Sequence, residues 1–152
     1  MQVVDVATRK VVKNIQVGKR PRRFAFNADA SELWVTNELG SSVSIISTKD
    51  LNVAHTLTFE VKGMRADDIS PVGIAMSPDH KTAYVSLGRA NHVAFVDVAS
   101  RKVTNLVLVG TSEGGLLVSS DRGATWARVP GTERWRKPRL FVATLRYSRR
   151  SF

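Results

Sequence analysis

The sequence predicts an all-β fold, a partial β-propeller of about three four-stranded antiparallel blades whose ring is not closed. Short runs rich in Val, Ile, Phe, Trp and Thr recur about every ten residues, as expected of strands joined by turns. The pattern of residues 21–53 returns 50 residues later without a gap, which is typical of an array of equal units. Runs such as residues 93–96 are apolar on both faces, and stacked blades bury both faces of each sheet.

The basic repeat is 42 residues long. Residues 4–11 match residues 96–103 at an offset of 92, and the middle copy, residues 46–53, lies 42 residues after the first. The second interval spans 50 residues and therefore carries an insertion of eight. The insertion lies near residues 62–68, which are polar and contain a glycine, so we expect a loop there.

Each unit is predicted to contain four strands. In the first full unit these strands cover about residues 22–27, 32–37, 42–47 and 52–58. Hairpin turns are expected at residues 27–30 and 77–80, because Asp and Asn accept hydrogen bonds from nearby backbone N–H groups and Pro78 presets a turn dihedral.

A third copy begins 42 residues after the second. Residues 116–118 take the place of residues 74–76, and the match continues as far as Val129. Residues 119–126 also fit the pattern Ser-x-Asp-x-Gly-x-Thr-Trp of the Asp-box hairpin found in sialidase-like propellers, which is a structural turn. Both interpretations predict a β-hairpin at this position. We therefore expect repeats over residues 1–129 and an irregular basic tail over residues 130–152.

The net charge of +10 comes mostly from this tail. Residues 132–152 hold seven basic residues against one acid, whereas the remaining 131 residues hold 16 against 12. The tail arginines could neutralise nucleic-acid phosphates, and four tail aromatics could stack on bases: Trp135, Phe141, Tyr147 and Phe152. An accidental basic tail explains the composition more simply, so nucleic acid is not the partner that we expect.

Composition excludes several classes of protein and site. No apolar run approaches 18 residues, so no membrane span is predicted. The first residues lack the basic, apolar and small-residue pattern of a secretory signal. The absence of cysteine excludes disulfides, thiolate metal ligands, covalent haem attachment and cysteine nucleophiles.

The motifs resemble those of a known family. Val-Gly-x-x-Pro at 17–21, Ser-Pro-Asp at 77–79, Trp-Val-Thr-Asn at 34–37 and Val-x-x-Val-Asp at 93–97 fall at successive positions of the repeat, with partial matches in the other units. This order resembles the YVTN family of β-propeller repeats over about residues 1–129. The segments 59–74 and 83–91 are similar to one subgroup, the propeller protein encoded alongside pyrroloquinoline-quinone (PQQ) dependent alcohol oxidation. That resemblance implies a periplasmic, non-enzymatic binding or scaffold module with no cofactor.

The chain departs from a closed propeller in three ways. A ring of about seven blades with this period needs roughly 290 residues. The sequence also starts at the third strand of a blade, and the pattern stops after Val129. We therefore expect a fragment, without a signal peptide of its own. Its open blade faces should bind a protein partner or a second copy of the chain.

Few residues are candidates for chemistry. Five aspartates recur with the repeat and are interpreted as turn residues rather than as a carboxylate ring: Asp5, Asp29, Asp79, Asp97 and Asp121. The three histidines are not spaced as metal ligands, and no nucleophile elbow, phosphate loop or dinucleotide fingerprint is present. We therefore predict no catalytic and no metal-binding residues.

The sharpest local cluster of charge is basic. Lys19, Arg20, Arg22 and Arg23 enter the first innermost strand, so they are expected at one rim of the central channel. Four cations there could bind an acidic partner or a carboxylate ligand. The main hypothesis is a non-enzymatic binding module. The alternatives are a fragment of a lactonase-like or haem-dependent reductase-like propeller enzyme, and nucleic-acid binding through the tail.

Overall fold

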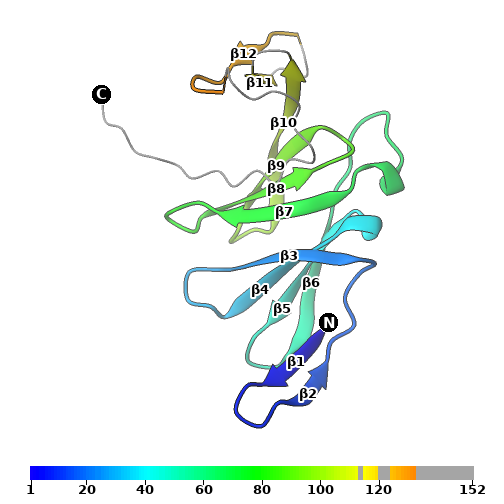
Figure 1. Ribbon diagram of the computed structural model, residues 1–152, viewed down its shortest axis with the longest axis vertical. Helices are drawn as coiled ribbons and strands as arrows, with labels where there is room; N and C mark the ends of the chain where they lie inside the picture. Colours follow the sequence, from blue (N-terminus) through cyan, green and yellow to red (C-terminus); the bar gives the residue numbers. More distant parts are fainter. Residues whose placement is uncertain (113–114, 120–123, 133–152) are drawn as a thin grey trace.

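The structure, a computed structural model, describes residues 1–112, 115–119 and 124–132. It confirms an open, nearly all-β array of antiparallel sheets (Figure 1). The first blade contains β3 (Pro21–Phe26), β4 (Glu32–Asn37), β5 (Ser42–Ser47) and β6 (Asn52–Thr58). The second contains β7 (Pro71–Met76), β8 (Thr82–Leu87), β9 (His92–Asp97) and β10 (Lys102–Ser112). Within each blade, neighbours in sequence pair antiparallel.

Two further strands form a half-blade beside the first blade. β1 (Gln2–Asp5) pairs with β2 (Lys10–Asn14) in a two-stranded sheet. The turn that joins them matches the turn between β9 and β10, since Asp5 accepts hydrogen bonds from Thr8 as Asp97 does from Ser100. β1 and β2 are therefore equivalent to the two outer strands of a blade.

Backbone conformation repeats with the sequence. Among the residues that the structure describes, nine non-glycine residues have positive φ, and they fall at four equivalent positions of the repeat. The turn between the third and fourth strands, for example, holds Arg9, Leu51 and Arg101 at φ of 55°, 53° and 56°. L-residues adopt this left-handed region only where the surroundings require it. The repeat therefore extends to the dihedral angles of the connecting turns.

The core lies between the blades, and strand alternation builds it. Trp34, Val43 and Ile45 point toward the second blade, where they meet Val85 and other buried side chains. Val35 and Ile46 point the opposite way, toward Ile15 and the β1–β2 hairpin. The sheet of the first blade is thus apolar on both faces, as the sequence predicts for stacked blades. β3 and β7 lie side by side, and the β1–β2 hairpin lies at the far end (Figure 1).

Besides the core, an ion pair joins the two blades. It lies at the end of the strands opposite to the inserted loop. Arg101, in the turn after β9, donates a hydrogen bond to Glu32 at the start of β4. Glu32 also accepts a 3.0 Å hydrogen bond from the indole N–H of Trp34. The ion pair is therefore held in place by the largest side chain of the core.

The third copy departs from the prediction in its pairing. β11 (Gly115–Ser119) and β12 (Ala127–Arg128) form the expected hairpin, but β11 pairs with β10 and extends the second sheet to six strands instead of starting a new blade. Leu117 faces Arg128, two residues beyond the partner that the repeat predicts. Among the described strands, β11 and β12 have no outer pair of their own, and they pair instead with the open edge of β10. The tail at 133–152, Asp121 and most of the Asp-box turn lie outside the described residues.

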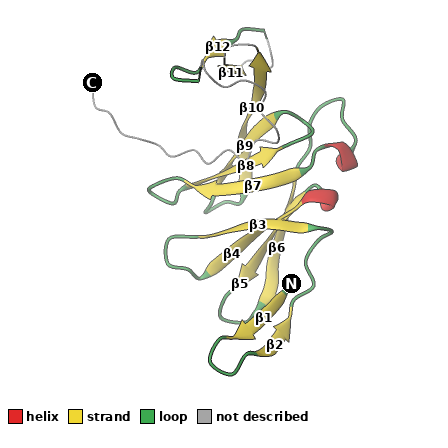
Figure 2. Cartoon of the chain, in the orientation of Figure 1, coloured by secondary structure: helices red, strands yellow, loops and turns green. Residues whose placement is uncertain are grey.

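No helix in the part of the chain that the structure describes is long and apolar enough to span a membrane. The two helices within the described ranges are single 3₁₀ turns, η1 (Glu38–Gly40) and η2 (Ala66–Asp68). Both lie at the same end of the blades (Figure 2).

Candidate functional site

One rim of the blades gathers the connections that vary most in length. We call it the loop rim, and it comprises residues 15–20, η1, residues 59–70 and residues 88–91. These segments either join an outer strand to the next innermost strand or join the second and third strands of a blade. Backbone hydrogen bonds tie them together, from Glu38 to Arg20 at 3.0 Å and from Gly88 to Ser70 at 2.8 Å. The rim is therefore a connected surface.

The basic cluster of the sequence lies on this rim and surrounds a carboxylate. The Nε atoms of Arg20 and Arg22 lie 3.2 and 3.3 Å from Oε2 of Glu38. The side chain of Glu38 is only 13% exposed, whereas that of Arg20 is 54% exposed. Lys19 and Arg23 are exposed and form no ion pair with another described residue. Two of the four cations are thus neutralised in part, and two face solvent.

Sequence reasoning missed Glu38. The position of Glu38 in the sequence could have indicated it, because Glu38 directly follows the strand motif Trp-Val-Thr-Asn and lies in the connection between β4 and β5. The segment before an innermost strand and the connection between the second and third strands meet at the same end of a blade. An acidic residue in the second segment can therefore reach cations in the first.

The hydroxyl group of Thr36 in β4 holds β3, the innermost strand, which begins within the basic cluster. It accepts a 3.1 Å hydrogen bond from the N–H of Arg23 and lies 3.0 Å from the carbonyl oxygen of Val72. In the second blade, Ser86 accepts the equivalent bond from Gly73 at 2.8 Å. Both bonds occur where the register of the innermost strand shifts, so the hydroxyl replaces a missing ladder bond.

Asn37 holds the base of the rim. Its side-chain N–H₂ donates to Ser42 and Ser44 at 3.1 and 2.9 Å, and the residue is fully buried. A Cβ atom on Gly18 would lie 2.6 Å from the Asn37 side chain, so only glycine fits there. The Val-Gly and Thr-Asn motifs therefore have a structural role, namely close packing of the entering loop on β4.

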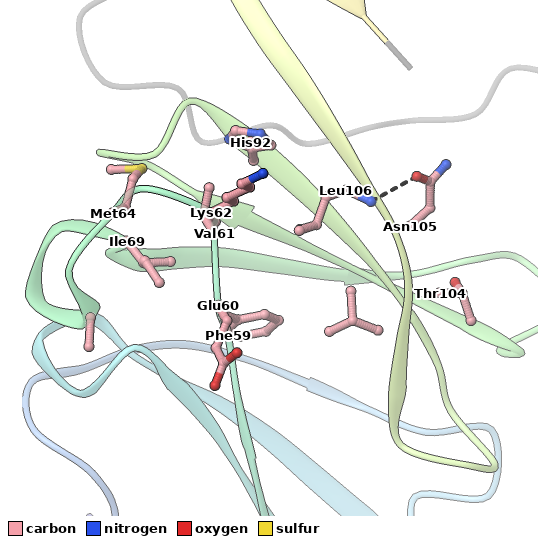
Figure 3. A pocket seen from close by; sticks show the side chains of 12 residues that line it. Phe59, Glu60, Val61, Lys62, Met64, Ile69, His92, Thr104, Asn105 and Leu106 are labelled. Atoms are coloured by element: carbon pink, nitrogen blue, oxygen red, sulfur yellow. Dashed lines mark hydrogen bonds between the residues drawn. The ribbon is translucent and has the colours of Figure 1, made fainter. Parts of the chain in front are cut away.

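The inserted loop forms one wall of a cavity of about 1030 Å³ (Figure 3). Phe59 and Ile69 line it from the loop, and Leu106 lines it from β10. Lys62 and His92 lie at one end, and Phe59 lies toward the other (Figure 3). The Nδ1 atom of His92 is 2.5 Å from the carbonyl oxygen of Ala90, which fixes the ring. The lining of the cavity comes from the inserted loop and from β9 and β10, and it does not include Arg20, Arg22 or Glu38.

The recurring aspartates serve their own turns, as the sequence predicts for those that the structure describes. Asp5 and Asp97 cap the turns before β2 and β10, while Asp29 and Asp79 cap the hairpins before β4 and β8. Hydrogen bonds from side-chain hydroxyl groups and backbone N–H groups lower the pKa of each carboxyl from its ordinary value. Within the described ranges, no three His, Asp or Glu side chains gather as metal ligands would.

Several solved structures resemble this chain in fold. Hydrazine synthase of Kuenenia stuttgartiensis is 22% identical with a TM-score of 0.59, over 76% of this chain and 37% of that one. The periplasmic gluconolactonase PpgL of Pseudomonas aeruginosa is 22% identical with a TM-score of 0.52, over 69% and 34%. A putative 6-phosphogluconolactonase of Bacteroides fragilis is 23% identical with a TM-score of 0.52, over 76% and 38%. The chain thus spans well under half the length of these proteins.

Among the curated proteins, none matches this chain. The sequence model of a family of enzymes does match, over residues 5–115, which is most of the chain. The predicted non-enzymatic character is therefore wrong, and the lactonase-like alternative is the better supported one. The repeat motifs could not distinguish an enzyme from a scaffold, because they reflect how a blade is built and both kinds of propeller share that construction. The chain belongs to the family described as lactonase, 7-bladed beta-propeller.

Proposed function

We propose that this chain is part of a lactone-hydrolysing propeller enzyme and that the Arg20–Arg22–Glu38 cluster belongs to its substrate site. The observation that carries the proposal is the family match, which includes the whole cluster within residues 5–115. The cluster also combines what the reaction needs, a carboxylate beside two guanidinium groups on the rim where the innermost strand begins.

The chemistry can be assigned to named groups. Lactone hydrolysis adds water to the carbonyl carbon, passes through an oxyanion, and breaks the ring C–O bond to give a hydroxy acid. Glu38 would accept the proton of the attacking water, because both ion pairs use its Oε2 and its Oε1 can take that role. The guanidinium groups of Arg20 and Arg22 would stabilise the oxyanion and then the product carboxylate. The exposed Lys19 and Arg23 would attract an anionic substrate.

A proton-release assay with sugar δ-lactones tests the proposal. It should use the full polypeptide in which this chain occurs, because the chain spans only 34–38% of its lactonase neighbours. Glu38→Gln should lower kcat by about 100-fold or more, the usual contribution of a general base. Arg22→Lys should raise KM, because an ammonium group cannot reproduce the planar guanidinium that contacts Glu38 and would bind the substrate.

Glu60→Gln is the matched control, since Glu60 is an exposed carboxylate on the same rim but outside the cluster. Full activity in Glu38→Gln, with active wild type, would remove the cluster from the mechanism. An inactive wild-type protein with every lactone tested would contradict the proposed reaction class.

We also propose a periplasmic location, which the YVTN-type resemblance favours and which the Pseudomonas aeruginosa neighbour has by its description. Fractionation of cells that produce the full polypeptide tests it, and recovery in the cytosolic fraction would contradict it. An association with PQQ-dependent alcohol oxidation rests on the resemblance of segments 59–74 and 83–91. Copurification with such a dehydrogenase tests that association.

A further inference from the structure

The inserted loop builds one wall of the cavity of about 1030 Å³. The loop adds eight residues to the repeat interval of 42, and its Lys62, Met64 and Ala66 line the cavity. The corresponding connection at residues 15–20 is too short to hold equivalents of these residues. The opposite wall comes from β9 and β10, which belong to a blade with all four of its strands. The insertion therefore adds a feature that the repeat alone does not specify.

The interior of the cavity is apolar and firmly supported. Phe59 and Ile69 are 2% and 1% exposed and belong to the core between the two blades. Met64 and Leu106 pack against that core. The volume is close to the upper limit of the usual range for small-molecule sites, about 300–1,000 Å³. Since Lys62 is exposed, the cavity also opens to solvent, and an apolar ligand that enters it leaves water.

Two polar groups of β10 in this lining already have partners. The hydroxyl group of Thr104 donates a 3.1 Å hydrogen bond to the carbonyl oxygen of Phe95. Oδ1 of Asn105 accepts a 2.8 Å hydrogen bond from the N–H of Leu106 (Figure 3). Both bonds lie at the bulge of β10, where the ladder is interrupted. The wall formed by β10 therefore offers a ligand mainly the apolar side chains of Val103 and Leu106.

Lys62 and His92 lie at one end of the cavity (Figure 3). Lys62 is in a turn that a 3.0 Å hydrogen bond from the N–H of Met64 to the carbonyl oxygen of Val61 closes. It forms no ion pair with another described residue. The carbonyl oxygen of Ala90 occupies Nδ1 of His92, so Nε2 is the nitrogen left for a ligand. This end therefore presents an ammonium group and an imidazole nitrogen to whatever enters.

The distribution of charge along the cavity favours an acid. Among the described lining residues the acid is Glu60, and it lies toward the other end, beside Phe59 (Figure 3). A carboxylate is attracted to Lys62 and repelled from the opposite end, so it has one favourable orientation. The hydrogen bond from an ammonium group to a carboxylate is among the stronger ones, because both partners are charged.

We propose that this cavity binds a small monocarboxylic acid with an apolar chain. The carboxylate accepts a hydrogen bond from Nζ of Lys62, and a second one from Nε2 of His92 when that ring is protonated. The chain lies against Met64, Leu106 and the buried ring of Phe59. The site shares no residue with the Arg20–Arg22–Glu38 cluster, so it is a second binding site of the protein.

Octanoate is a suitable probe, and Met64 is a suitable reporter. The chain has three methionines, of which Met64 lines the cavity and Met76 packs in the core. The full polypeptide in which this chain occurs is labelled with ¹³C at the methionine methyl groups, and the Met64 signal is identified by its loss in Met64→Leu. Octanoate should shift this signal to saturation and leave that of Met76 in place. Octanol, which has the same chain without the charge, should bind about tenfold more weakly.

Lys62→Met tests the cationic end, because it removes the charge and keeps an unbranched side chain. It should weaken octanoate binding about tenfold and leave octanol binding unchanged. Lys49→Met is the matched control, since Lys49 is an exposed lysine in the turn between β5 and β6 and does not line the cavity. This control should bind octanoate as the wild type does.

Three results would overturn the proposal. They are an unshifted Met64 signal with octanoate, equal octanoate affinity in Lys62→Met and wild type, and binding of octylamine as tight as that of octanoate. Lactonase activity does not enter any of these measurements, so this site and the proposed reaction fail independently.

Discussion

At the scale of single residues, the hydroxyl group of Thr36 connects two blades. It accepts a hydrogen bond from Arg23 in its own blade and lies within hydrogen-bonding distance of Val72 in the next. Both contacts involve backbone groups at register shifts, where no ladder partner exists. A hydroxyl group suits this position because it both donates and accepts, and Ser86 shows that the methyl group is not required.

Thr36→Val should therefore destabilise the protein although it keeps the shape of the side chain. The N–H of Arg23 and the carbonyl of Val72 would lose a partner, which costs about 2 kcal/mol. Thr36→Ser retains the hydroxyl group and should cost less than about 1 kcal/mol. Urea unfolding at one fixed protein concentration measures both variants. Equal losses for valine and serine would show that packing, rather than hydrogen bonding, explains the threonine.

The aspartates in the turns should make the folded protein less stable as the pH falls. Hydrogen bonds from Thr8 and Ser100 lower the pKa of Asp5 and Asp97 below the ordinary value near 3.8. The unfolded chain then binds these protons more readily, so the carboxylates contribute stability above about pH 4, and that contribution is lost as the pH falls through the folded values.

The double variant Asp5→Asn, Asp97→Asn should lose less stability than the wild type between pH 5 and pH 2, because asparagine keeps an acceptor oxygen but does not titrate. The thermal midpoint measured across this range checks the difference. Parallel pH profiles for the variant and the wild type would contradict a role for these two turns in acid sensitivity.

At the scale of elements, the sequence predicts the blades well, because their signals are local. Strand alternation, turn aspartates and a period of 42 residues lie within short windows, and the inserted loop is visible as a change in that period. The pairing of β11 with β10 could not be predicted in this way. Whether a strand starts a new blade or extends an existing sheet depends on which strand edges are unpaired in the folded chain. The repeat gives residues 115–119 the position of an innermost strand, but it does not show that the edge of β10 is unpaired.

The candidate site was predicted in part, for a related reason. Lys19, Arg20, Arg22 and Arg23 form a visible run of charge. Glu38 is a single acid 16 residues beyond Arg22, and only the meeting of two connections at one rim reveals it as a partner. The link between Arg101 and Glu32 is more distant still, at 69 residues, because it joins neighbouring blades. Contacts within one connection can be predicted from sequence, whereas contacts between connections require the geometry of the array.

At the scale of the whole molecule, stability depends on neighbours. Repeat arrays are held together by the intrinsic stability of each unit and by the interfaces between units. The first blade is covered on one face by the second, but on the other face only its outer half is covered, by β1 and β2. Phe24 and Phe26 therefore remain in contact with water in a single copy, and any association that covers them stabilises the folded chain.

Thermal stability should therefore depend on protein concentration. If copies associate through this face, mass action favours the folded assembly, and a tenfold rise in concentration should raise the thermal midpoint by roughly 2 °C or more. The double variant Phe24→Asp, Phe26→Asp should melt at a midpoint that does not change with concentration, since its face no longer attracts a second copy. Scans at 5, 50 and 500 µM (about two decades in all) provide the measurement, with Leu39→Asp as the variant expected to behave like wild type. A wild-type midpoint that stays constant over this range would contradict association through Phe24 and Phe26. The two blades would then be stable as a monomer, with this face exposed to water.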